Sequence, residues 1–330
     1  MSVTPQQNSA ASLVEVARAA NVSVGTASRV MNGTANVNDA LRRRVIVAGR
    51  KLGFVPKLRR RHLAVIAGRQ SPALPVGYVS VMSSLISRIA LSRQLGVELL
   101  DVEELDDIGS CHIDAALGVV FDDRILQLKD YPNLPLVTIN HPMTGQGIHS
   151  LYTDHHWQGR TATQHLVEKG HERIGFLAIE PEEWGARQRH AGYRAALEAA
   201  GIEYNPALVR YSIDEPVYEV LRQWRRLGIT AILNFSEDAA LETLHLLSNV
   251  FDLRIGEDIS TITLEDLPIY QYLTPPQTVI RQPLSELAEQ AVDAVLRLAQ
   301  RGEPDAPSEP IDICLGSELI ERESVADLRQ

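Results

Sequence analysis

Near the amino terminus, apolar residues recur every three or four positions in three short stretches. The first stretch places Leu13, Val16 and Ala20 on one helical face. Ser12 precedes it, and Glu15 follows at the spacing of a capping box, in which each side chain bonds the backbone amide of the other residue. The pattern therefore predicts a short helix that begins after Ser12.

The second stretch follows Ser23, a favoured capping residue, keeps Ala27 on its inner face and stops at residues 32–33. The third begins after Asn38 and carries an apolar stripe as far as Leu52. Two short helices joined by a tight turn and followed by a third are typical of a helix-turn-helix unit.

Beyond residue 62 the pattern changes to short apolar runs that alternate with helical stretches. The apolar runs are predicted as strands at 63–67, 97–102, 116–121, 136–140, 173–179, 231–235 and 260–264. The helical stretches lie near 76–95, 157–169, 186–200, 216–227, 237–250 and 284–301. Such alternation predicts parallel sheets wrapped by helices, with the carboxyl ends of the strands gathered at one edge of each sheet.

Charge is distributed unevenly along the chain. The net charge is -10, yet residues 1–62 carry eleven lysines and arginines against two acidic residues, whereas the remainder carries 21 against 40. A basic head on an acidic body indicates a polyanionic partner such as DNA. The alternative is a solvated basic face without a partner.

Neither a membrane segment nor a disulfide framework is expected. An uncharged apolar run of about 18 residues is missing from the sequence, and its first residues lack the order of a secretory signal. Cys111 and Cys314 are too few for a disulfide framework and are expected to be buried thiols. These features favour the cytoplasm.

The basic segment resembles the head of the LacI/GalR family of repressors. The resemblance runs in order and spacing through residues 13–17, 21–23, 26–33 and 52–56. It implies that Val24, Gly25 and Arg29 face DNA bases, and that the residues which anchor phosphates or cap the helix are Ser23, Thr26, Ser28 and Asn32.

Arg29 is the strongest candidate for a base contact, since a guanidinium can donate twice to guanine. Gly25 departs from the family pattern because it has no side chain to read a base, and it weakens a helix by about 1 kcal/mol relative to alanine. Val24 is expected to pack on a thymine methyl, or else to be a partly exposed apolar residue without a role in specificity.

The join between head and body is short. The family usually places a hinge helix there, with an apolar residue that enters the minor groove. Only residues 57–62 separate Pro56 from the first predicted strand, so a full hinge helix is not expected. Leu58 is the candidate wedge, and Arg59 to Arg61 are candidates for phosphate contacts.

Residues 154–193, 257–260 and 275–279 resemble the body of the same family, which is similar to periplasmic sugar-binding proteins with two lobes that close on a ligand. The expected fold is a three-helix, all-α head and an α/β body of two doubly wound parallel-sheet lobes. The expected division is a head at 1–57 with a flexible tail at 1–11, a linker at 58–62, a first lobe at 63–156 and 283–306, and a second lobe at 157–282 and 307–330.

The family resemblance implies that Arg189 donates to a bound effector and that Glu265 accepts from its hydroxyl groups. Further candidates stand at predicted strand ends, where doubly wound sheets bind ligands, and three aromatic residues are candidates for a flat apolar face, or for simple core. These further candidates are Asn140, Ser236, Glu237, Phe121, Trp184 and Tyr211. The family commonly has Asn-Asp at 236–237 and Asp at 265, which leaves the effector identity open.

Signatures of catalysis and of metal binding are missing from the sequence. It contains no G-x-G-x-x-G after the first strand, no phosphate-binding G-x-x-x-x-G-K-[ST] and no G-x-S-x-G. Histidines 149, 155, 156 and 165 are expected to be loop residues rather than metal ligands, because adjacent histidines rarely present both rings to one ion. We therefore expect no enzyme activity, no metal and no cofactor.

The expected function is a cytoplasmic transcription repressor that binds double-stranded DNA. A homodimer would place two heads on a pseudo-palindromic operator, and a sugar-like effector bound between the lobes would change the operator affinity. The direction of that change stays open, and no membrane partner is expected. The alternatives are an α/β enzyme or a sugar-binding protein that acts on a polyhydroxy ligand.

Overall fold

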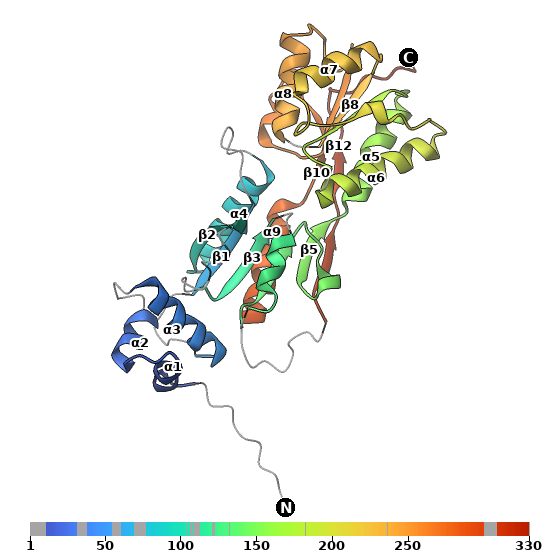
Figure 1. The fold of residues 1–330 in the computed structure, drawn as a ribbon. Coiled ribbons are helices and arrows are strands. Elements are labelled where there is room, and N and C mark those ends of the chain that lie inside the picture. Colours follow the sequence, from blue (N-terminus) through green and yellow to red (C-terminus); the bar gives the residue numbers. More distant parts are fainter. Residues whose placement is uncertain are drawn as a thin grey trace, which may run out of the picture.

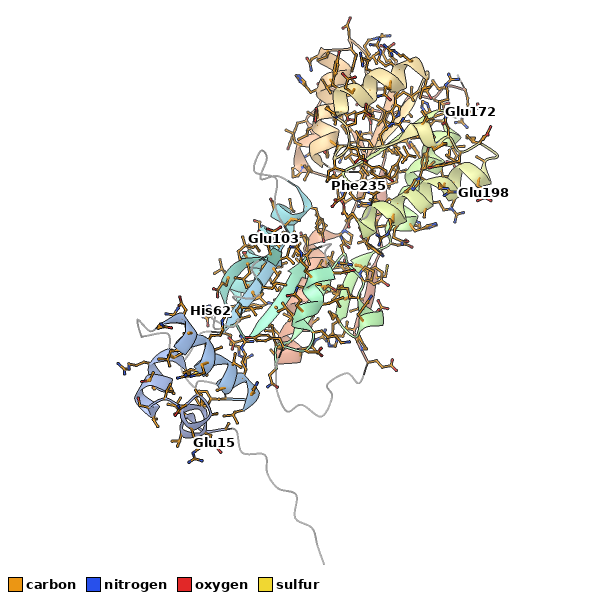
Figure 2. The ribbon with its side chains drawn as sticks, viewed as in Figure 1. Glu15, His62, Glu103, Glu172, Glu198 and Phe235 are labelled. Atoms are coloured by element: carbon orange, nitrogen blue, oxygen red, sulfur yellow. The ribbon has the colours of Figure 1, made fainter. Side chains whose placement is uncertain are left out.

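The computed structural model shows a helical head followed by two α/β lobes (Figure 1), whose side chains are drawn in the same view in Figure 2. It describes residues 11–31, 38–54, 61–68, 77–103, 105, 108, 113–120, 123–131, 133–181, 183–235, 237–299 (side chains of 237 and 238 excepted) and 309–329. The expected fold class, a three-helix head with two parallel-sheet lobes, is confirmed.

The head consists of α1 (Leu13–Ala19), α2 (Val24–Met31) and α3 (Asp39–Lys51). Ser12 and Glu15 form the expected capping box, and the Asn38 side chain accepts from the amide of Ala40. The apolar stripes of the three helices meet in a small core around Val16, Ala27 and Val45. Because the inner faces are used for this core, the remaining faces are available to a partner.

The first lobe is built on a six-stranded parallel sheet. Its strands, in the spatial order β11-β5-β4-β3-β1-β2, are β11 (Asp312–Leu315), β5 (His149–Thr153), β4 (Leu136–Ile139), β3 (Ala115–Val119), β1 (His62–Ala67) and β2 (Gly96–Asp101). Helices α4 (Tyr78–Ser92) and α9 (Leu284–Ala299) cover one face, and the 3-10 helix η2 (Asp123–Leu128) with neighbouring loops covers the other.

The second lobe repeats the plan. Its sheet has the order β12-β10-β9-β8-β6-β7, and its strands are β12 (Glu318–Ile320), β10 (Thr278–Arg281), β9 (Ser260–Thr263), β8 (Ala231–Asn234), β6 (Ile174–Ala178) and β7 (Val209–Tyr211). Helices α5 (His155–Glu168) and α6 (Trp184–Ala199) cover one face, and α7 (Val217–Arg226) and α8 (Glu237–Asn249) cover the other. Only β12 runs antiparallel.

The hydrophobic pattern of the sequence did not predict five of the described strands: β5, β7, β10, β11 and β12. All are short, and β11 and β12 are edge strands whose residues are half-buried or exposed, so no continuous apolar run marks them. Because β11 pairs with β5, the assignment of all of 307–330 to the second lobe is wrong for 312–315. The expected burial of Cys314 is also wrong, since it is exposed on β11. Cys111 lies outside the described residues.

Within the described residues, the chain passes between the lobes three times. The crossings follow β5 at Asp154, β10 at residues 282–283 and β11 at residues 316–317. Each crossing joins an end of a first-lobe element to an end of a second-lobe element, so the three segments form the connection between the lobes. Polar side chains at these crossings are therefore placed to respond to a relative movement of the lobes.

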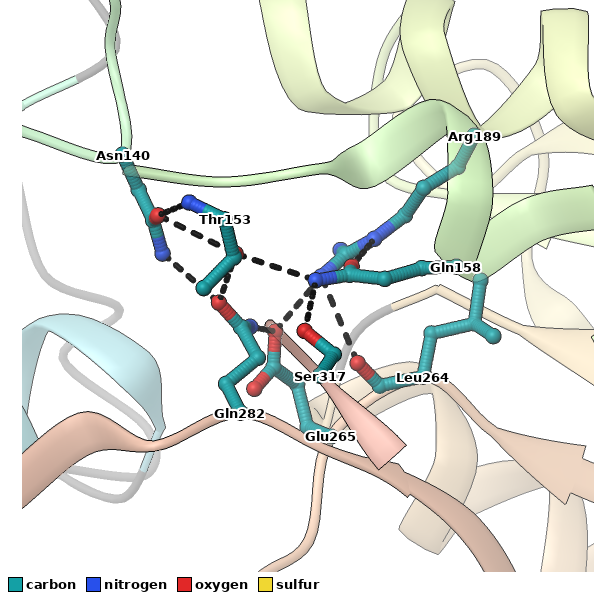
Figure 3. Close-up of polar contacts among 8 residues, drawn as sticks. All are labelled: Asn140, Thr153, Gln158, Arg189, Leu264, Glu265, Gln282 and Ser317. Atoms are coloured by element: carbon teal, nitrogen blue, oxygen red, sulfur yellow. Dashed lines mark hydrogen bonds and ion pairs between the residues drawn. The ribbon is translucent and has the colours of Figure 1, made fainter. Parts of the chain in front are cut away.

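Helices α5 and α6 approach so closely that their backbones touch at two glycines. A β-carbon on Gly159 would lie 2.0 Å from the carbonyl oxygen of Arg189, and one on Gly192 would lie 2.1 Å from that of His156. Only glycine fits at such a crossing. This close packing fixes the position of Arg189, which α6 directs toward the junction of the lobes (Figure 3).

Candidate DNA-reading surface and interlobe site

The second helix of the head separates a buried side from an exposed side. Ala27, Val30 and Met31 belong to the core of the head. All six described candidates for DNA contact lie on or just before α2: Ser23, Val24, Gly25 and Arg29 are exposed, and Thr26 and Ser28 are half-buried. The remaining candidates, Asn32 and Leu58, lie outside the described residues.

Local hydrogen bonds order the beginning of α2. The Ser23 hydroxyl oxygen accepts from the backbone amide of Thr26 at 3.1 Å, as expected of a cap. The Arg29 side chain donates from Nε to the Gly25 carbonyl oxygen at 3.2 Å, which lays the guanidinium along the helix. A β-carbon on Gly25 would meet nothing closer than the Ser23 hydroxyl at 3.9 Å, so the glycine leaves open space beside Arg29.

The two acidic residues of the head are held by local partners. Bonds donated by the Ser12 backbone and hydroxyl groups lower the pKa of Glu15, which stays ionised within its capping box. Asp39 lies 3.6 Å from Arg42. Arg43 and Arg44 are exposed on α3, so the surface around α2 retains a positive charge.

A buried polar network occupies the junction of the lobes (Figure 3). At its first-lobe end the Asn140 side chain accepts from the Thr153 amide at 2.8 Å and donates to Gln282 at 2.8 Å. The Thr153 hydroxyl donates to the same Gln282 oxygen at 2.6 Å and accepts from Gln158 at 3.0 Å. Gln158 also donates to Ser317 at 3.0 Å, so the network includes all three crossing segments.

The second-lobe end of the network is an ion pair between Arg189 and Glu265. Nη2 of Arg189 lies 2.9 Å from Oε1 of Glu265, and Nε donates to Gln158 at 2.8 Å. Gln282 donates to the same carboxylate oxygen at 2.6 Å. Arg189 is 2 % exposed and Glu265 is 6 % exposed, so each buried charge is compensated by the opposite charge of its partner rather than by water. The guanidinium also lies over the Phe235 ring, 4.5 Å from its centroid.

The structure thus brings together three of the effector candidates, Asn140, Arg189 and Glu265. Sequence reasoning missed their partners Thr153, Gln158, Gln282 and Ser317, which lie at the lobe crossings. Gln282 directly follows β10, so recognising that strand would have indicated it.

The other described effector candidates are not members of this network. Trp184 is half-buried at the start of α6, with its ring 6.4 Å from that of Tyr152. Tyr211 is half-buried and packs against the core of the second lobe, the alternative considered for the aromatic residues. Phe121 and Ser236 lie outside the described residues, and Glu237 begins α8 with its side chain outside the description.

The expectation that the four histidines lie in loops is wrong, because they lie in β5 and α5. One of them, His155, is buried beside the network, and neither of its ring nitrogens is hydrogen-bonded to a residue that the structure describes. Its ring lies 5.0 Å from that of Trp184, and its Nδ1 lies 2.7 Å from the place where a β-carbon on Gly185 would stand. Burial and the nearby Arg189 charge keep the pKa of His155 well below its ordinary value, so the imidazole is neutral. An unpaired polar ring of this kind is costly unless a water or a ligand bonds it.

The low pKa of His155 makes folding sensitive to acid. Below pH 6.5 the unfolded chain binds a proton at this residue and the folded protein does not, so stability falls as the pH falls. We expect His155→Phe to reduce this slope by about 1.4 kcal/mol per pH unit, the linkage of one proton. Urea unfolding at several pH values between 7.5 and 5.5 measures it, and an unchanged slope would contradict the buried neutral imidazole.

Within the described parts of the chain, no group of three or more histidine, cysteine or carboxylate side chains is placed to hold a metal ion. Among the same residues, the helices are too short or too polar for any of them to span a bilayer.

Two family models match the chain. The model of bacterial regulatory proteins of the lacI family matches residues 12–57, and the model of the periplasmic binding protein-like domain matches residues 163–325. The first match contains the whole helical head, and the second contains most of the second lobe with the crossings at residues 282–283 and 316–317.

Curated and solved relatives extend over nearly the whole chain. The transcriptional regulator CelR of Thermobifida fusca is 29 % identical, with 94 % of this chain and 96 % of the relative covered. A solved complex of the regulator CelR with cellobiose is 27 % identical, has a TM-score of 0.69, and covers 95 % of this chain and 99 % of its own. The lac repressor dimer bound to operator shares the fold at 23 % identity, a TM-score of 0.67 and coverage of 96 % and 100 %.

Proposed function

Because the chain belongs to the LacI/GalR family of transcriptional regulators, we propose that it is a cytoplasmic repressor without enzyme activity, whose operator affinity changes when a sugar-like effector binds between its lobes. The observation that supports this best is the pairing of an exposed, positively charged α2 face with a buried polar network at the three lobe crossings. The proposed division places the DNA-reading head before residue 58 and a short basic linker at 58–62.

The chemistry of the junction favours a polyhydroxy ligand. Its side chains are amides, two hydroxyls, an ion pair and a neutral imidazole, and such groups both donate to and accept from hydroxyl groups. Trp184 supplies an apolar face beside His155. The CelR relative was solved with cellobiose, so cellobiose is the first sugar to test.

The proposed assembly is a homodimer on a pseudo-palindromic operator. Two exposed leucines, Leu91 at the end of α4 and Leu99 on the edge strand β2, mark an apolar side of the first lobe that a second copy would cover. Contact at this side would hold the two heads at a fixed distance, which a two-fold related pair of half-sites requires.

The proposed function is tested by selecting genomic DNA fragments with the purified protein and screening sugars for their release. We expect one or a few pseudo-palindromic sites to be enriched, and a sugar to change their affinity. Turnover of any sugar in the panel would support the enzyme alternative, and sugar binding without DNA enrichment would support a sugar-binding protein.

Arg29→Ala should reduce discrimination at one base pair of the enriched operator by about 1–3 kcal/mol, because the exposed guanidinium is the candidate that can donate twice to guanine. Affinities for single-base operator variants measure this. An equal loss on every duplex, random ones included, would show that Arg29 contacts only phosphates. Arg18→Ala, an exposed cation on α1, serves as the matched charge control.

A further inference from the structure

The head contacts the first lobe through Arg50, near the end of α3. Arg50 is 9 % exposed, although its neighbours Arg43, Arg44 and Lys51 are exposed. Its Nη2 donates to the carbonyl oxygen of Ile113. This residue therefore faces the body rather than solvent.

Tyr131 and Asn133, which precede β4, complete the contact between head and first lobe. The guanidinium carbon of Arg50 lies 5.1 Å from the centroid of the Tyr131 ring, within cation–π range. The Asn133 side-chain amide donates to the Arg50 carbonyl oxygen, so both the side chain and the backbone of Arg50 are bound. We call Arg50, Ile113, Tyr131 and Asn133 the Arg50 contact. Figure 1 shows the head at the end of the first lobe that lies away from the second lobe.

A single strand runs from the Arg50 contact to the interlobe network. Asn133 stands just before β4, and Asn140, the first-lobe member of the network, directly follows it. The distance along the chain between them is about 20–25 Å at the rise of an extended strand. All four residues of β4 are buried between β3 and β5, so the strand is packed on every side.

Backbone conformation fixes both ends of this path. Asn133 and Asn140 each have a φ of 53°, a left-handed conformation that asparagine tolerates better than most residues. The Asn133 side chain donates a hydrogen bond to Arg50 of the head, and the Asn140 side chain bonds Gln282 and Thr153 at the crossings. Because the strand is rigid and closely packed, a shift at one of its ends displaces the other end as well.

We propose that the Arg50 contact transmits the state of the lobe junction to the DNA-reading head. The inference rests on the proposed function and adds the route of its regulation. Rearrangement of the network around Asn140 moves β4, β4 carries Tyr131 and Asn133 with it, and α3 follows through Arg50. The five residues between Pro56 and β1 then need not carry this signal.

The first test asks whether the contact holds the head, in the absence of DNA and sugar. Nuclear magnetic relaxation of the full-length protein gives the tumbling rates of head and body amides. We expect head and body to tumble together in the parent and in Tyr131→Phe, which keeps the aromatic face. In Tyr131→Leu the head should reorient at least about twofold faster. A head that tumbles independently in the parent, or with the body in Tyr131→Leu, would overturn the proposal.

The second test asks whether the contact couples the two sites, with Asn140→Ala as the probe at the junction. Operator affinity is measured for the parent, Asn140→Ala, Tyr131→Leu and the double variant. We expect Asn140→Ala to change the affinity about tenfold in the parent and to have little effect in the Tyr131→Leu background. Equal changes in both backgrounds, or no change in either, would overturn the proposal.

A second variant shows whether the result is specific to the Arg50 contact or is a general consequence of substituting Tyr131. Asn133→Gly keeps the left-handed backbone accessible and removes only the amide that donates to Arg50, so it should weaken the coupling in the same direction. Additive results from a protein that still prefers its operator would refute this inference alone. Absence of any duplex preference would refute the proposed function with it.

Discussion

The Arg189→Ala protein should no longer change its operator affinity when the sugar identified by screening is added, while its affinity in the absence of that sugar persists. Arg189 links Gln158 on a crossing helix to Glu265 in the second lobe, and its removal disconnects the two ends of the network. The head contains none of these residues and keeps its own core, and Asn140, the network residue that directly follows β4, keeps its bonds to Gln282 and Thr153, so DNA binding should remain.

The same substitution should lower the free energy of unfolding of the body by about 3–5 kcal/mol, because it leaves the buried Glu265 carboxylate without its cation. Urea unfolding gives the stability, and operator titrations with and without sugar give the response. Arg187→Ala, an exposed residue two positions earlier on α6, is the matched control and should behave as the parent. An Arg189→Ala protein with normal stability and a full response would show that the ion pair has neither role.

Among glycine-to-alanine substitutions in the second lobe, Gly159→Ala should lower the stability most. Its β-carbon would stand 2.0 Å from the Arg189 carbonyl oxygen, which is backbone and cannot rotate away. Helices α5 and α6 would have to separate. We expect the free energy of unfolding to fall by about 3 kcal/mol, the upper end of the usual cost of overpacking.

Displacement of α6 by Gly159→Ala also moves Arg189 relative to Glu265, so sugar affinity should fall together with stability. Thermal unfolding and sugar titration measure the two effects. Gly145→Ala is the control, because a β-carbon at that position meets nothing within 4 Å and its backbone is not left-handed. If both alanine variants unfolded at the same temperature, the close contact of the helices would be wrong.

The sequence predicted the elements whose information is local. Capping residues such as Ser12 and Asn38 and the apolar stripes define the head helices, and the alternation of apolar runs with helices defines the class of the body. The edge strands β11 and β12 were not found because their stability comes from pairing with distant strands, β5 and β10, rather than from their own apolar content.

The candidate site was predicted in part for the same reason. Asn140, Arg189 and Glu265 could be placed at strand ends or by family position, whereas the bond from Gln158 to Ser317 joins residues 159 positions apart in the chain. In the sequence, Arg50 is one of several cations of α3. Its burial against Tyr131 depends on how the head meets the body, which no pattern within the head encodes.

The basic head is expected to read a DNA sequence. Fluorescence anisotropy of the full-length protein measures this, with the enriched operator and a scrambled duplex of equal length at several salt concentrations between about 50 and 200 mM. We predict that operator binding weakens steeply with salt and that the operator is preferred by about a thousandfold or more. Equal affinity for both duplexes at every salt concentration would contradict it.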